Sequence, residues 1–84
     1  MLSPIEIDVS SLEPPEPMTE ILSALSQLNA CQYLKIIHRR QPYPLYEKLV
    51  ENGYHFVVDE ISSERFHIYI CTAKNAPRLV LERN

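Results

Sequence analysis

The chain has 84 residues, of which 45% are hydrophobic and 23% are charged, and its formal net charge is −3. A chain of this length forms one compact domain with a small core, so we expect a single domain over residues 1–84 with its core at about 5–72. The negative charge argues against nucleic acid as a partner, and no apolar run approaches the roughly 20 residues of a membrane span.

Strands and helices are predicted to alternate along the first half of the chain. The run IEIDV (5–9) alternates β-branched and acidic residues, which predicts a strand. Apolar residues then recur at steps of three and four from Met18 to Leu28, the spacing of one face of an amphipathic helix. The β-branched run QYLKIIH (32–38) predicts the next strand.

The second half predicts one more helix and a hairpin. The helix begins at Pro44, a residue that suits the first helical turn, and ends at Gly53 in the left-handed conformation of a C-terminal cap. The runs HFVVDEI (55–61) and FHIYICT (66–72), joined by the turn SSER, predict two antiparallel strands. The tail AKNAPRLVLERN (73–84) is either loosely ordered or adds an edge strand at RLVLE.

The order of elements is therefore β-α-β-α-β-β. A strand, a helix and a strand in this length require a right-handed crossover and parallel strands, and two such units place both helices on one face of the sheet. We predict an α/β (α+β) two-layer sandwich, in which a four-stranded mixed sheet carries two helices on one face.

The other face of the sheet is expected to lack helices. Alternate residues of the strands 32–38 and 66–72 belong to this face, and they include Tyr33, Lys35, His67, Tyr69 and Cys71. The face is either an ordinary strand surface or a contact surface for a partner or a second copy. The protein is accordingly expected to be a monomer or a weak homodimer.

Three prolines lie where the first helix begins, in LEPPEPM (12–18). Proline costs little in a first helical turn, because the N–H that it lacks has no intrahelical partner there, but it removes donors that could bind an anion. The segment DVSSLEPPEPM (8–18) resembles the start of SirA/TusA sulfur carriers, in which a strand ending in Asp precedes a leucine and a Cys-Pro-x-Pro motif. The matching residues are Asp8, Leu12, Pro15, Glu16 and Pro17.

The opening EPPEPM and the second helix, HRRQPYPLYEKLVENGYHF (38–56), are similar to an uncharacterised branch of this superfamily, a domain of unknown function. The likeness covers roughly residues 5–72 and implies the TusA/SirA-like fold, which is shared with the C-terminal domain of translation initiation factor three. In sulfur carriers the cysteine of the motif accepts persulfide sulfur. Pro14 stands at that position here and has no nucleophile, so the carrier mechanism does not transfer to it.

The remaining cysteines, Cys31 and Cys71, lie far apart and form no C-x-x-C pair. Each is either a small buried hydrophobe, as free cysteine most often is, or a displaced sulfur-relay thiol. The three histidines are scattered, and a structural zinc site needs four clustered ligands, so we expect no metal and no other cofactor. Free thiols and an N-terminus without a secretory signal pattern indicate a cytoplasmic protein.

Ligands of open α/β sheets bind outside the carboxyl ends of the strands, where the first two strands end and both helices begin. We refer to this edge as the rim, and its candidate binding residues are Glu13, Glu16, His38, Arg39, Arg40 and Tyr43. Arginines before a helix start oppose the helix dipole and require a negative partner. That partner is either Glu13 or Glu16 in a surface ion pair, or an anionic ligand or acidic protein, since arginine binds carboxylate and phosphate through two hydrogen bonds.

The sequence shows no acid–base pair and no activated nucleophile, so we expect no catalytic residue. The favoured hypothesis is a non-enzymatic binding or adaptor domain whose rim binds another protein or a small anionic ligand. Sulfur relay through a displaced thiol is the alternative. A nucleic-acid or ribosome-associated role rests on the analogy of fold alone.

Overall fold

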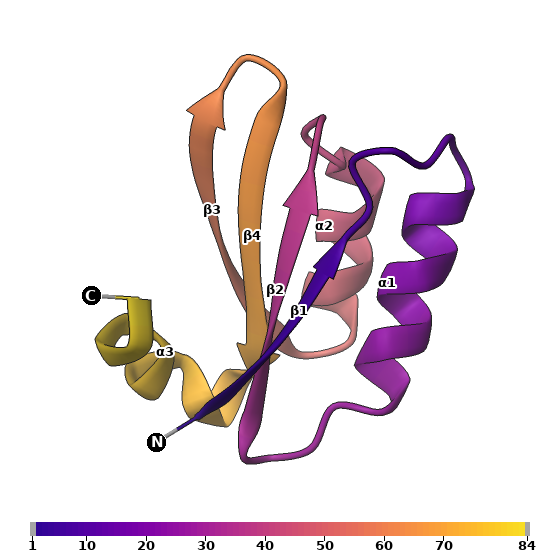
Figure 1. Cartoon of the computed structure of the whole chain (residues 1–84). Helices are drawn as coiled ribbons and strands as arrows, with labels where there is room; N and C mark the ends of the chain where they lie inside the picture. Colours follow the sequence, from indigo (N-terminus) through magenta and orange to yellow (C-terminus); the bar gives the residue numbers. More distant parts are fainter. Residues whose placement is uncertain (1, 84) are drawn as a thin grey trace.

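The computed structural model describes residues 2–83, with side chains for residues 2–79. The elements are β1 (Ser3–Asp8), α1 (Glu16–Ser26), β2 (Gln32–His38), α2 (Tyr43–Glu51), β3 (Tyr54–Ser62), β4 (Arg65–Thr72), a 3-10 turn (Ala73–Asn75) and α3 (Ala76–Arg83). The predicted two-layer α/β sandwich with a four-stranded mixed sheet is confirmed (Figure 1). Gly53 ends α2 with a φ of 76°, the left-handed cap that the sequence predicts.

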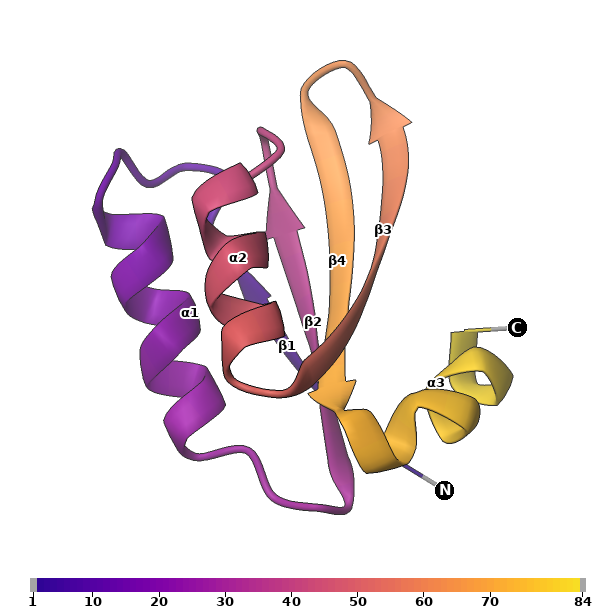
Figure 2. The ribbon, with the colours of Figure 1, turned by 180° about the vertical axis from the view of Figure 1, so that it is seen from behind.

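The strands lie in the order β1-β2-β4-β3. β1 pairs in parallel with β2, placing Ile5 opposite Leu34, and β4 runs antiparallel to both of its neighbours. Each helical connection returns the chain to the same end of the sheet, so β1, β2 and β3 share one direction. The starts of α1 and α2 therefore lie at the same end of the molecule as the ends of β1 and β2 (Figures 1 and 2).

α1 and α2 cover one face of the sheet (Figure 2). In the helices the buried side chains recur at a spacing of four, and in β2 and β4 the residues of this core are two apart, because these are the periods at which side chains return to one face. The core residues are Val9, Ile21, Leu25, Leu34, Ile36, Leu45, Leu49, Ile68 and Ile70.

The prediction for the tail was wrong over residues 73–83, which form the 3-10 turn and α3 rather than a loose segment or an edge strand. Asn84 lies outside the described residues. Pro77 lies in the first turn of α3, where proline is tolerated. Leu79 is fully buried against Leu2, Tyr33 and Cys71 on the face opposite α1 and α2 (Figure 1). The segment RLVLE alternates like a strand and does not by itself indicate a helix. The burial of Leu79 stabilises the helix instead.

The second face of the sheet is thus partly covered, which corrects the expectation that it lacks helices. Tyr33 and Cys71 are buried beneath α3 instead of facing outward. Farther along the face, Lys35 forms an ion pair with Glu6 at 3.4 Å and lies over the ring of Tyr69 at 6.0 Å from its centroid. A contact with a second copy through this remaining surface stays a prediction.

Candidate functional site

The starts of α1 and α2 have the same pattern and enclose a pocket between them. α1 begins at Pro15-Glu16-Pro17 and α2 at Pro42-Tyr43-Pro44, so each helix has a proline at its N-cap and another at its second position. Proline holds φ near the helical value, which makes both starts rigid. The pocket has a volume of about 180 Å³.

The pocket is mostly apolar, and three of its lining residues have polar side chains. The lining residues are Pro14, Pro15, Pro17, Met18, Ile21, His38, Arg40, Gln41, Pro42, Pro44 and Leu45. Ile21 and Leu45 also belong to the core and are fully buried, so the pocket reaches the core of the domain. The prolines contribute no N–H, and the polar groups at the pocket therefore come chiefly from three side chains: His38, Arg40 and Gln41.

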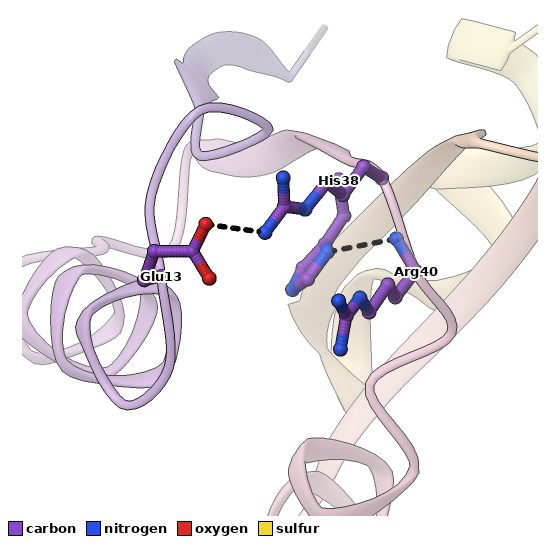
Figure 3. Close-up of polar contacts among 4 residues, drawn as sticks. Glu13, His38 and Arg40 are labelled. Atoms are coloured by element: carbon purple, nitrogen blue, oxygen red, sulfur yellow. Dashed lines mark hydrogen bonds and ion pairs between the residues drawn. The ribbon is translucent and has the colours of Figure 1, made fainter.

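His38, the last residue of β2, is 8% exposed. Its Nδ1 atom accepts a hydrogen bond of 3.1 Å from the backbone N–H of Arg40 (Figure 3). An accepting Nδ1 carries no proton, so the neutral ring carries its proton on Nε2. Burial lowers the pKa of His38, and the charges of Arg39 and Arg40 lower it further. The side chain is thus a neutral N–H donor near pH 7.

The two neighbouring arginines of the rim differ in their partners. Arg39 Nη2 donates to Glu13 Oε1 at 2.9 Å, an ion pair that joins the segment before α1 to the segment before α2 (Figure 3). The Glu13 side chain is 74% exposed, so the pair contributes about 0–1 kcal/mol. Arg40 lines the pocket, and its guanidinium has no ion pair or side-chain hydrogen bond with residues 2–79.

Acidification from pH 7 to pH 5 is expected to lower the free energy of unfolding. Burial lowers the pKa of His38 and of His67, whose Nε2 is buried without a hydrogen-bond partner among the described residues. Around and below the usual pKa of 6.5 the unfolded chain therefore binds more protons than the folded chain. The free energy of unfolding consequently decreases as the pH is lowered. Thermal unfolding across this range measures the effect, and His67→Gln should reduce the slope. An unfolding temperature that is constant from pH 7 to pH 5 would contradict this prediction.

Two other predicted rim residues lie outside the pocket lining. Glu16 is exposed in the first turn of α1. Tyr43 is 66% exposed and contacts the edge of the Tyr46 ring, with 5.8 Å between the centroids. Tyr46 in turn stacks on Phe56 and donates its hydroxyl to Gln41, and burial together with Tyr43 raises the pKa of Tyr46 to about 12. Tyr43 thus packs on the outside of the helix start.

Neither cysteine lies at the pocket. Cys71 is fully buried, and burial raises the pKa of its thiol, which favours the unreactive protonated form. Cys31 is exposed in the connection between α1 and β2, at the end of the molecule opposite the pocket (Figure 1). The described residues contain no group of three or more His, Cys, Asp or Glu side chains that could hold a metal ion.

The apolar character of the pocket was missed in the sequence analysis. The residues overlooked are Pro14 and Met18 as pocket-lining groups, together with Ile21, Pro42 and Leu45. A signal was present, since the pattern Pro-x-Pro occurs at 15–17 and again at 42–44, at the starts of both helices that begin on one edge.

The fold and the site define a small two-layer α/β domain with an apolar pocket at the carboxyl ends of two parallel strands. The chain belongs to a family described as "Uncharacterized conserved protein (DUF2249)", whose model matches residues 6–71. The matched region contains every residue that lines the pocket and ends before α3. Comparisons with curated proteins and with solved structures gave no match. None of the helices within residues 2–83 has the length and apolar character needed to cross a bilayer.

Proposed function

We propose that this protein is a non-enzymatic binding domain of the cytoplasm, and that its binding site is the pocket between the starts of α1 and α2. The observation that carries the proposal is the combination of an apolar wall with two donors, a buried His38 and an Arg40 that has no ion pair with residues 2–79. Ligand pockets in proteins typically have this composition, in which apolar surface supplies affinity and a few polar groups set the orientation.

The side chains of the pocket favour binding over catalysis. Among the residues that line it there is no Ser, Thr, Cys, Lys, Asp or Glu that could act as a nucleophile or as a partner for His38. The Nδ1 atom of His38 is already engaged by a backbone N–H. A general base and a nucleophile within hydrogen-bond reach of each other are the usual requirement for covalent catalysis.

Sulfur relay is less well supported than binding. Pro14 lines the pocket, so the position at which sulfur carriers hold their reactive cysteine borders the proposed binding site. The resemblance to those carriers therefore agrees with a binding site at this edge of the sheet. The site here lacks the reactive cysteine that the carriers have. A relay would depend on the exposed Cys31, which lies at the other end of the molecule.

A fragment screen monitored by NMR tests the proposal. With ¹⁵N-labelled protein and a library of neutral, cationic and anionic fragments, we expect binders to shift amide signals in both 14–21 and 38–46. Met18→Trp places a larger side chain at the pocket and should abolish these shifts. Leu22→Trp alters α1 at a residue that does not line the pocket, and should leave them intact. Binders that shift only other regions, or that are insensitive to Met18→Trp, would overturn the proposal.

A further inference from the structure

We propose that the pocket selects a compact apolar carboxylate, a monocarboxylic acid with a hydrocarbon part about the size of a benzene ring. The hydrocarbon part occupies the proline-lined cavity, and the carboxylate accepts hydrogen bonds from the Arg40 guanidinium and from Nε2–H of His38. This inference rests on the proposed function and adds to it the chemical class of the ligand.

The volume and the wall of the pocket limit the apolar part of the ligand. An engineered protein cavity of about 150 Å³ lined by apolar side chains binds benzene, and the pocket here has about 180 Å³. Its wall consists of prolines with Met18, Ile21 and Leu45. A sugar or another polyhydroxylated molecule of this size would lose its hydrogen bonds to water without regaining them from this wall.

The charges around the pocket favour an anion. Glu13 is engaged by Arg39, Glu16 is exposed in the first turn of α1, and no acidic residue lines the pocket. The positive ends of the α1 and α2 dipoles point toward this edge of the sheet. Burial lowers the pKa of His38 most, and the further lowering by Arg39 and Arg40 agrees with a positive potential at the site.

The hydrogen-bond donors at the two helix starts fit a carboxylate better than a phosphate. Phosphate is usually held by several free N–H groups at a helix start, and at these two starts the second position and the N-cap are prolines. The N–H groups of Glu16, Tyr43 and Leu45 donate to the carbonyls of Glu13, Gln41 and Pro42.

Besides the amide N–H₂ of Gln41, whose Oε1 accepts from Tyr46, two side chains can donate to a ligand at the pocket. They are the fork of Arg40 and the Nε2–H of His38, which lie on the same side of the segment after β2 in Figure 3. An arginine fork and one further donor match the two oxygens of a carboxylate.

Calorimetric titration at pH 7 with benzoate, benzamide, acetate and inorganic phosphate tests the proposal. Benzamide keeps the ring without the charge, and acetate keeps the charge without the ring. We expect benzoate to bind at least about tenfold more tightly than each of the other three. Benzamide lacks the charge, and a hydrogen bond to a charged group commonly contributes a factor of this size or more. Acetate and phosphate lack the ring that would bury apolar surface in the cavity.

The neighbouring arginines provide a matched pair of variants. Arg40→Gln should weaken benzoate binding by about tenfold or more and weaken benzamide binding by less, because the hydrogen bond to the neutral amide is the weaker one. Arg39→Gln removes the same charge from an arginine that Glu13 already engages, and should change benzoate affinity by less than about threefold. Circular dichroism of both variants checks that they are folded.

Three results would overturn the carboxylate assignment: benzamide or phosphate binding as tightly as benzoate, benzoate binding that is unaffected by Arg40→Gln, or equal losses in the two arginine variants. If neutral fragments still shift the pocket amides in a manner that depends on Met18, the proposed binding function stands and only the ligand class is wrong. If no compound of either experiment binds the pocket, both proposals fail.

Discussion

Replacement of Leu79 by alanine is expected to lower the free energy of unfolding by about 2–5 kcal/mol. Leu79 of α3 is fully buried, and it packs in a cluster with Leu2, Tyr33 and Cys71 on the face opposite α1 and α2. Truncation removes buried methyl groups and leaves a cavity between the helix and the sheet. Urea denaturation of the parent and variant proteins measures the loss.

Val50→Ala is the matched control for this substitution. Val50 is an aliphatic helical residue that is 67% exposed, so its truncation should change stability by no more than about 0.5 kcal/mol. A second measurement is the rate of thiol alkylation under native conditions. Cys71 should react faster in Leu79→Ala than in the parent, whereas the exposed Cys31 should react rapidly in both. A variant that is as stable as the parent and keeps Cys71 protected would contradict the packing of α3 on the sheet.

Leu45→Ala should also destabilise the protein by about 2–5 kcal/mol, and it should enlarge the pocket as well. Leu45 is fully buried, belongs to the core and lines the pocket. The lost side chain therefore becomes space that a longer ligand can fill. We expect the affinity for 4-ethylbenzoate relative to benzoate to rise in this variant, as measured by calorimetric titration.

Leu49→Ala separates the two consequences of that change. Leu49 lies one turn farther along α2 and is 1% exposed, but it does not line the pocket. Its truncation should cost a similar amount of stability without altering the preference between the two ligands. Equal changes of ligand preference in both variants would mean that the pocket does not have the boundary described.

The strands and the first two helices could be predicted because local pattern and final packing agree for these segments. The alternation from Phe66 to Cys71 separates the two faces of β4, and Ile21 and Leu25 repeat at the spacing of one helix face. The tail was mispredicted because RLVLE alternates locally like a strand. Its helix depends on the burial of Leu79 against side chains from other segments of the chain.

The charged residues of the rim could be identified from the sequence, but its apolar surface was missed. Arg39 and Glu13 could be placed together because residues that follow parallel strands meet at one edge. Their neighbour Arg40 has the same side chain, and nothing local distinguishes the two arginines. The difference arises because Glu13, on a separate segment, is positioned to meet Arg39, while Arg40 lies at the pocket.

Residue identity and spacing along the chain were enough for the order of elements from β1 to β4, the parallel pairing of β1 with β2, and the lack of a nucleophile at Pro14, because each depends on one segment or on segments that follow one another in the chain. Three-dimensional packing was needed for the position of β4 between β2 and β3, the burial of Cys71 beneath α3, and the pocket between the two Pro-x-Pro helix starts. Each of these arises where segments distant in the chain come into contact, and the free energy of that contact is not encoded in either segment alone.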